Sequence, residues 1–193
     1  MKTIINDFNN EIIIKNSRFI TLLYKFYDND DLNKFIDIAK DKYPKATHYT
    51  YAYITESFKK SSDDGEPGGT AGVPMLSVLE KEDLINVLAI TIRYFGGIKL
   101  GAGGLVRAYS KSVRDAIVDD NLCELEEGLE VKITTTYDRQ KDLDYLLKDY
   151  EIINKAYDEN VIYNVLIPNN NIDIISNYQY EIISKRLIKK VAK

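Results

Sequence analysis

A glycine-rich segment that carries several basic residues is the part of the sequence best suited to chemistry. Residues 92–107 read IRYFGGIKLGAGGLVR, which predicts a buried strand, a loop with five glycines and the start of a helix. Glycine lets the backbone turn sharply and lets another group approach closely. A helix N-terminus offers unpaired N–H groups and a partial positive charge. We therefore predict an anion- or nucleic-acid-binding site, made of Arg93, Gly96, Gly97, Lys99, Gly101, Gly103, Gly104, Arg107, Lys111 and Arg114.

The helix expected at about residues 104–119 adds a basic face to this segment. At 100° per residue, Arg107, Lys111 and Arg114 form one stripe, and apolar residues cover the opposite side. No acidic residue occurs in residues 93–114, so the stripe suits a polyanion such as RNA. Two simpler interpretations stay open, namely a solvated basic face and a tight strand-to-helix turn without a ligand.

An acidic loop, residues 59–69, is the counterpart of the basic segment. Its carboxylates Asp63, Asp64 and Glu66 fall within four residues. They could hold a divalent ion through oxygen ligands, pair with the basic stripe, or cap the helix that follows. Their spacing is not that of an EF-hand, so the presence of a metal is left undecided.

Several classes of site are excluded by missing residues. The glycine segment lacks the Lys-Ser/Thr end of a P-loop, and Val106 stands where a dinucleotide fingerprint needs glycine or alanine, so no nucleotide cofactor is predicted. His48 is the one histidine and Cys123 the one cysteine, too few for a zinc site or a disulfide. No Gly-x-Ser-x-Gly elbow occurs, and no catalytic residue is predicted.

Composition and periodicity predict two α+β domains. In residues 1–121 we expect strands at 11–15, 18–26, 48–55 and 84–94 and helices ending at Pro44 and spanning about 70–81 and 104–119. In residues 122–193 we expect strands at 129–137, 152–157, 161–167 and 186–191 and helices at 138–149 and 172–183. The acidic stretch after Asn121 marks the boundary. The order β-α-β-β-α-β of the second part is that of a ferredoxin-like domain. With no apolar run near 18 residues and no signal peptide, we expect a cytoplasmic protein that does not enter a membrane.

Five short motifs together resemble the signatures of the YigZ/Impact family. They are SRFI at 17–20, SDDGEP at 62–67, GTAG at 69–72, RYFGGIKLG at 93–101 and GGLVRAY at 103–109. The resemblance covers about residues 1–121, with Gly68 where the family usually has alanine or serine. It implies an N-terminal fold of the ribosomal-protein type, like domain IV of elongation factor G, and a second domain similar to domain V of that factor. Eukaryotic relatives regulate translation through an additional N-terminal domain, which this sequence lacks. Some bacterial members carry a proline-dipeptidase label, which one histidine does not support.

Three functional hypotheses follow. The leading one is a non-enzymatic, translation-linked regulator that binds RNA, the ribosome or a translation-associated protein through the basic loop and helix. The second is an enzyme or sensor of a small phosphorylated ligand, with Mg²⁺ held by Asp63 and Asp64. The third is a protein-interaction module that uses the tyrosines of strand 48–55 or the basic tail at 185–193.

Overall fold

The structure is a computed structural model that describes residues 1–190; residues 191–193 lie outside the description. The chain divides into two compact units, Met1–Cys123 and Glu124–Lys193. Both combine antiparallel strands with helices, so the chain is of the α+β class, as predicted. Among the described helices, none has the length and apolar character needed to cross a membrane.

One antiparallel sheet organises the first unit. Its strands lie in the order β2–β3–β6–β4–β5. They span Phe8–Ile14 (β2), Ser17–Lys25 (β3), Val87–Tyr94 (β6), His48–Ile54 (β4) and Lys59–Ser62 (β5), and a short strand, Lys2–Ile4 (β1), precedes them. The central strand β6 is buried from Val87 to Arg93, in keeping with its run of apolar residues.

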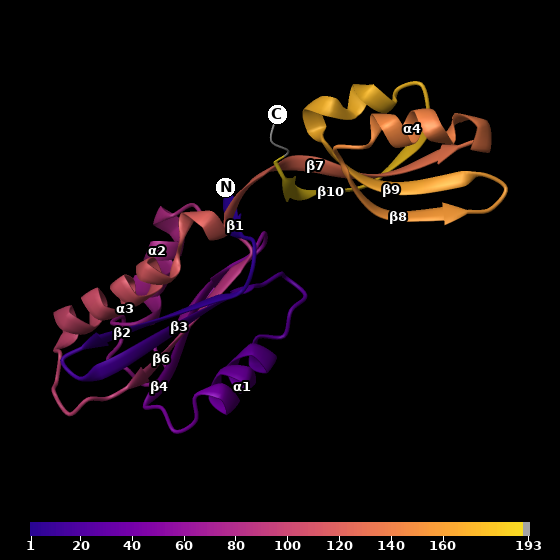
Figure 1. The fold of residues 1–193 in the computed structure, drawn as a ribbon. Helices are drawn as coiled ribbons and strands as arrows, with labels where there is room; N and C mark the ends of the chain where they lie inside the picture. Colours follow the sequence, from indigo (N-terminus) through magenta and orange to yellow (C-terminus); the bar gives the residue numbers. More distant parts are fainter. Residues whose placement is uncertain (191–193) are drawn as a thin grey trace. The chain divides into compact units, whose positions relative to one another are not determined.

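Helices cover both faces of this sheet (Figure 1). Helices α2 (Gly72–Lys81) and α3 (Ala102–Ala116) pack on one face, and α1 (Leu32–Lys42) packs on the other. Successive strand residues point to opposite faces, so Phe19 joins the core under α2 and α3 while Ile20 joins the core under α1. The tyrosines of β4 were considered as a docking face, but they pack half-buried against the α1 core: Tyr49, Tyr51 and Tyr53.

The second unit places strands in the order β8–β9–β7–β10. The elements are β7 (Leu122–Thr135), α4 (Gln140–Leu146), β8 (Glu151–Tyr157), β9 (Val161–Pro168) and β10 (Gln179–Lys189), with 3₁₀ helices at Tyr137–Arg139 and Asn169–Ile175. A further 3₁₀ helix, Asp119–Asn121, precedes β7 at the end of the first unit. Its core contains Val131 from β7, Leu143 from α4 and Tyr163 from β9.

The acidic stretch and the basic tail pair with each other in this unit. Strands β7 and β10 run antiparallel, which brings the acidic stretch alongside the basic tail, although within these two blocks the residues directly opposite are not of opposite charge: Glu130 lies across from Ser184 and Arg186 across from Gly128. Arg186 lies 3.0 Å from Glu130, and Lys190 lies 2.8 Å from Glu124. The two charge blocks therefore offset each other locally, and much of the described tail is engaged within its own sheet.

Four sequence predictions need correction. Residues 59–62 were expected in a loop but form β5, whose polar residues are tolerated because it lies at a sheet edge. The strand expected at 129–137 begins at Leu122, so the acidic stretch forms the start of β7, and the division between the two units falls within it, after Cys123. Where a helix was expected at 172–183, the chain forms a 3₁₀ helix followed by β10, in which Ile182 pairs with Val131 of β7. The prediction failed because the apolar spacing of a short run fits a helix and a strand equally well. Helix α4 is shorter than predicted. The expected strand end at Val191 lies outside the described residues.

Candidate anion-binding site

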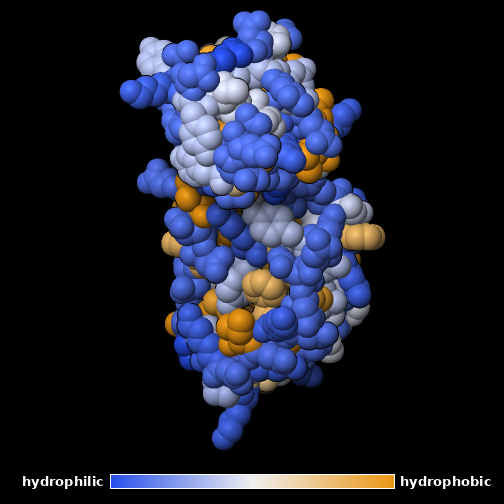
Figure 2. Space-filling model, turned by 90° about the vertical axis from the view of Figure 1, so that its right-hand side faces the viewer, coloured by the Kyte–Doolittle hydropathy of each residue, from blue (hydrophilic) through white to orange (hydrophobic). Residues whose placement is uncertain are grey.

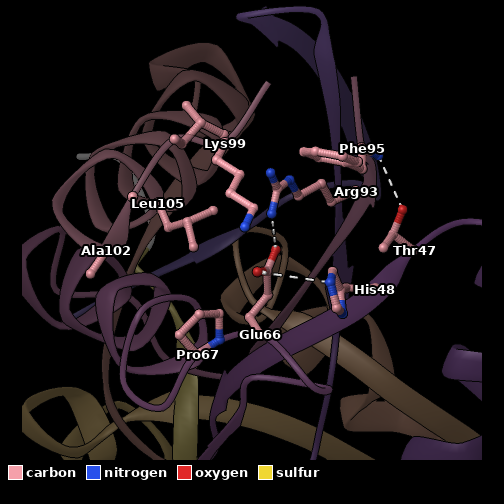
Figure 3. A pocket seen from close by; sticks show the side chains of 11 residues that line it. Thr47, His48, Glu66, Pro67, Arg93, Phe95, Lys99, Ala102 and Leu105 are labelled. Atoms are coloured by element: carbon pink, nitrogen blue, oxygen red, sulfur yellow. Dashed lines mark hydrogen bonds and ion pairs between the residues drawn. The ribbon is translucent and has the colours of Figure 1, made fainter. Parts of the chain in front are cut away.

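A pocket of about 390 Å³ lies at the end of the first unit's sheet, beside the N-terminus of α3 (Figure 3). Its walls come from the start of β4, the loop before α2, the end of β6 and the segment that enters α3. The lining residues are Thr47, His48, Glu66, Pro67, Arg93, Phe95, Lys99, Leu100, Gly101, Ala102 and Leu105. The pocket thus gathers parts of both the basic segment and the acidic loop.

Strand register brings the polar residues of the pocket together. Phe19, Arg93 and His48 are direct partners across β3, β6 and β4, so their side chains share the face covered by α3. The Arg93 guanidinium lies over the Phe19 ring at 5.4 Å and over the Phe95 ring at 5.6 Å. These rings hold the guanidinium in place by cation–π contact and by packing.

A buried ion pair joins the basic segment to the acidic loop. Arg93 Nη1 donates to Glu66 Oε1 at 2.6 Å, and the two side chains are 6% and 3% exposed. Tyr109 Oη donates to the same oxygen at 2.7 Å. Burial, and then the hydrogen bond to Glu66, raise the pKa of Tyr109 far above its usual value, so the phenol remains protonated as a donor. The charge of Arg93 is therefore compensated inside the protein, unlike the charges on the surface of α3.

His48 faces the other oxygen of the same carboxylate. Its Nε2 lies 3.8 Å from Glu66 Oε2, and its Nδ1 lies 2.8 Å from the Asp64 carbonyl oxygen. Because a carbonyl oxygen can only accept, Nδ1 carries a hydrogen, and Nε2 is the nitrogen directed at Glu66 (Figure 3). No local sequence pattern indicates this role of His48, because it depends on the pairing of β4 with β6.

The two aspartates of the acidic loop bind backbone groups. Asp63 accepts hydrogen bonds from the N–H groups of Gly69, Ala71 and Gly72 at 2.8, 3.0 and 2.8 Å, and so caps the start of α2. Burial alone raises the pKa of Asp63, but these three hydrogen bonds outweigh it and the pKa lies below its usual value. Asp64 Oδ2 accepts from the N–H of Tyr49 at 2.6 Å.

The three loop carboxylates therefore do not converge on one point. No group of three or more His, Cys, Asp or Glu side chains in the described residues is placed to hold a metal ion. Within the acidic loop, Asp63 therefore acts as a helix cap, and Glu66 pairs with a basic residue, Arg93, which lies outside the Arg107–Lys111–Arg114 stripe.

The glycines of this segment have different structural roles. A side chain on Gly96 would collide with the backbone of Asn16 and Ser17, and its N–H donates to Ser17 Oγ at 3.1 Å, so Gly96 packs the loop onto the β2–β3 turn. Gly97 and Gly101 have φ values of +83° and +73°, which favour glycine. Gly103 and Gly104 lie in the first turn of α3, which begins two residues earlier than predicted.

The N-terminus of α3 opens toward the pocket through Gly101 and Ala102. A helix leaves its first N–H groups without intrahelical partners, and no side chain caps them in α3. The first turn contains no acidic residue, and Lys99 lies just before it. The helix dipole and the lysine both favour an anion here.

The remaining predicted cations lie on the outer face of α3. Arg107, Lys111 and Arg114 are exposed, whereas Ala108 and Val113 are buried, as the stripe predicted. Lys111 forms an exposed 2.7 Å ion pair with Asp115, which contributes little and is screened by salt.

Large apolar side chains are also exposed beside this face. Phe95 is 48% exposed and Ile98 46% exposed, so the loop before α3 offers apolar as well as basic contacts. The view in Figure 2 is largely hydrophilic, with hydrophobic side chains in separate small groups. Exposed apolar groups beside cations are typical of surfaces that contact nucleic acids.

Known proteins resemble this chain along most of its length. The model of the Impact N-terminal domain matches residues 15–117. The IMPACT family member YvyE of Bacillus subtilis (strain 168) is 36% identical over 177 residues, which cover 89% of this chain and 82% of YvyE. The family member YigZ of Escherichia coli (strain K12) is 35% identical over 162 residues, 80% of this chain and 79% of YigZ. A crystal structure described as that of a hypothetical protein is 29% identical, with a TM-score of 0.63, and covers 95% of this chain and 97% of its own.

Proposed function

Because the chain belongs to the Impact family, we propose that it is a translation-linked regulator without enzymatic activity that binds RNA or the ribosome. The binding surface is the outer face of α3, with Arg107, Lys111 and Arg114, together with Lys99 at the helix start. One observation carries this proposal. These four cations lie along one helix and its entry, and no acidic residue interrupts them between positions 93 and 114.

The geometry of α3 suits a chain of phosphates better than a single phosphate. Arg107 and Arg114 are seven residues apart, which is about 10 Å along a helix axis, so they cannot share one phosphate group. Each cation would contact its own phosphate, and binding would weaken as salt rises because counterions are released on association. The exposed Phe95 offers a ring on which an unstacked base can lie.

The expected domain architecture belongs to the same proposal. We assign the first unit to the ribosomal-protein type, like domain IV of elongation factor G, for residues 1–121. We assign residues 122–193 to the ferredoxin-like type, supported by the strand order β8–β9–β7–β10 and by α4 between β7 and β8. Folds of these types would suit a protein that contacts a ribosomal surface.

The experiment is co-sedimentation of the protein with ribosomes and with total RNA, at low and moderate salt. The variant Arg107→Glu with Lys111→Glu should lose the salt-sensitive binding. A matched control, Lys34→Glu with Lys40→Glu, makes the same charge change on α1, across the sheet from α3. Equal loss of ribosome and RNA binding in both double variants would show that binding depends on net charge rather than on the α3 surface, and it would contradict the proposal.

A partner protein is the other candidate for this surface. Binding that survives nuclease treatment but is lost in the α3 variant would assign the surface to a translation-associated protein. The basic tail is a weaker candidate, because Arg186 and Lys190 already pair with acidic residues of β7.

A further inference from the structure

One carboxylate oxygen in the pocket is left without a hydrogen-bond donor. Glu66 has a side chain only 3% exposed, and its Oε1 accepts from both Arg93 and Tyr109. Its Oε2 receives no hydrogen bond from the described residues, and His48 Nε2 lies 3.8 Å from it. Figure 3 shows this second oxygen turned toward the interior of the pocket. This oxygen is not among the fully buried atoms without a partner, so it can be reached from the pocket, and a ligand there could donate to it.

The pocket favours a donor without positive charge. The Glu66 carboxylate is already paired with the guanidinium of Arg93, so an ammonium group beside it would gain little from the carboxylate and would be repelled by Arg93 and Lys99. A hydroxyl group meets no such repulsion. When neutral, His48 presents a lone pair at Nε2, because its Nδ1–H is donated to the Asp64 carbonyl. Two acceptors 3.8 Å apart match two neighbouring hydroxyl groups of a sugar ring.

The opposite wall of the pocket favours an anion. It consists of the uncapped start of α3 at Gly101 and Ala102, and of Lys99, whose amino group points into the pocket in Figure 3. Lys99 forms no ion pair with the described residues. With Arg93 and Glu66 offsetting each other, Lys99 and the helix dipole leave the site net positive.

We propose that this pocket binds a ribose phosphate group. The phosphate would lie at Lys99 and the start of α3, and two ribose hydroxyls would donate to Glu66 Oε2 and His48 Nε2. The volume of about 390 Å³ is within the range of small-molecule sites and exceeds what a phosphate ion alone would fill. The group could come from a free ribonucleotide or from the 3′-terminal nucleotide of an RNA chain, where both ribose hydroxyls are free. No metal at Asp63 or Asp64 takes part, since both carboxylates already accept from backbone N–H groups.

Calorimetric titration of the full chain in EDTA provides the test. The probes are adenosine 5′-monophosphate, ribose 5-phosphate, 2′-deoxyadenosine 5′-monophosphate and inorganic phosphate. We expect the two ribose compounds to bind at least tenfold more tightly than the deoxynucleotide and than phosphate. Equal binding of the ribo and deoxy compounds, or no binding by any probe, would overturn the proposal.

Two variants locate the ligand. Lys99→Ala changes an exposed side chain and should weaken binding of ribose 5-phosphate about tenfold or more, whereas Lys60→Ala on β5 should not. Glu66→Gln should remove the preference for ribose over deoxyribose. If Glu66→Gln does not fold, His48→Phe provides the same readout. Retention of both affinity and preference in Lys99→Ala and His48→Phe would contradict the assignment.

A competition experiment distinguishes the two possible sources of the ribose phosphate group. If the pocket holds an RNA end, adenosine 5′-monophosphate displaces an oligoribonucleotide with a free 3′ end; if it holds a free nucleotide, RNA binding is unaffected, and either result supports the pocket. This inference shares Lys99 with the proposed RNA surface but does not involve Lys111 or Arg114. Lys111→Glu with Arg114→Glu should abolish RNA binding while leaving ribose phosphate binding intact, so failure of one proposal is distinguishable from failure of the other.

Discussion

Arg93 and Glu66, 27 residues apart in the chain, form a buried 2.6 Å ion pair at the floor of the pocket. Their pairing ties the loop before α2 to the end of β6, and Tyr109 attaches α3 to the same carboxylate. The basic segment and the acidic loop are therefore parts of one structural unit. The cations available to a ligand are those that this pair leaves free, on the outer face of α3 and at Lys99.

Replacing Arg93 should destabilise the first unit strongly. The variant Arg93→Met leaves Glu66 buried and charged, which costs about 3–5 kcal/mol. Urea unfolding measures the change, with Arg107→Met as the control, because Arg107 is exposed and its loss should change stability by less than about 0.5 kcal/mol. Similar stability of the two variants would mean that the Arg93–Glu66 pair does not hold the unit together.

Asp63→Asn should lower stability in a pH-dependent way. Asp63 accepts hydrogen bonds from three backbone N–H groups, and the amide NH₂ of asparagine would point a donor at one or more of these donors. The loss of such a helix cap costs about 1–2 kcal/mol. The pKa of Asp63 is lowered in the folded state, so its stabilisation is fully present above the usual value of 3.8 and is lost as pH falls through the folded pKa.

Unfolding free energies of wild type and Asp63→Asn, measured from pH 7 downward, test this directly. The difference between the two proteins should be constant above about pH 5 and should shrink below the usual aspartate pKa. If the difference in unfolding free energy stays unchanged down to the lowest pH at which both proteins fold, the charge of Asp63 is not its origin.

Two alanine substitutions in the glycine segment should have opposite effects. Gly96→Ala forces a methyl group into the backbone of Asn16 and Ser17 and should cost at least about 2 kcal/mol. Gly103→Ala meets only the far end of the Arg107 side chain and replaces glycine within a helix, so it should be neutral or stabilising by up to about 1 kcal/mol. Thermal unfolding of both variants decides the matter. Equal destabilisation of the two variants would mean that Gly103 is required for a reason other than the space around it.

Part of this organisation follows from the sequence. The strand, loop and helix of residues 92–107 follow from an apolar run, glycines and a basic stripe, all of which are local patterns. The convergence of His48, Glu66 and Arg93 is not local, because it requires the register of β4 against β6 and the path of the loop before α2. Sequence spacing alone therefore left a metal, a helix cap and pairing with the basic stripe open for carboxylates that bind N–H groups and an arginine.

Charge blocks show the same limit. The acidic residues 119–130 and the basic residues 185–193 are evident in the sequence, but only the pairing of β7 with β10 reveals that Glu130 and Arg186 offset each other. The α3 stripe is different, because within the described residues the sole acidic side chain paired with it is Asp115, which contacts Lys111. This contrast is the reason to place the proposed binding surface on α3 and not on the tail.

The salt dependence of RNA affinity tests the central claim most directly. Filter binding of a single-stranded RNA is measured from low to moderate salt for the wild type and for Arg107→Ala with Lys111→Ala and Arg114→Ala. If three phosphate contacts are lost, the slope of log affinity against log salt should become shallower by about 2, at roughly 0.7 per contact. An unchanged slope and affinity in the triple variant would contradict the account.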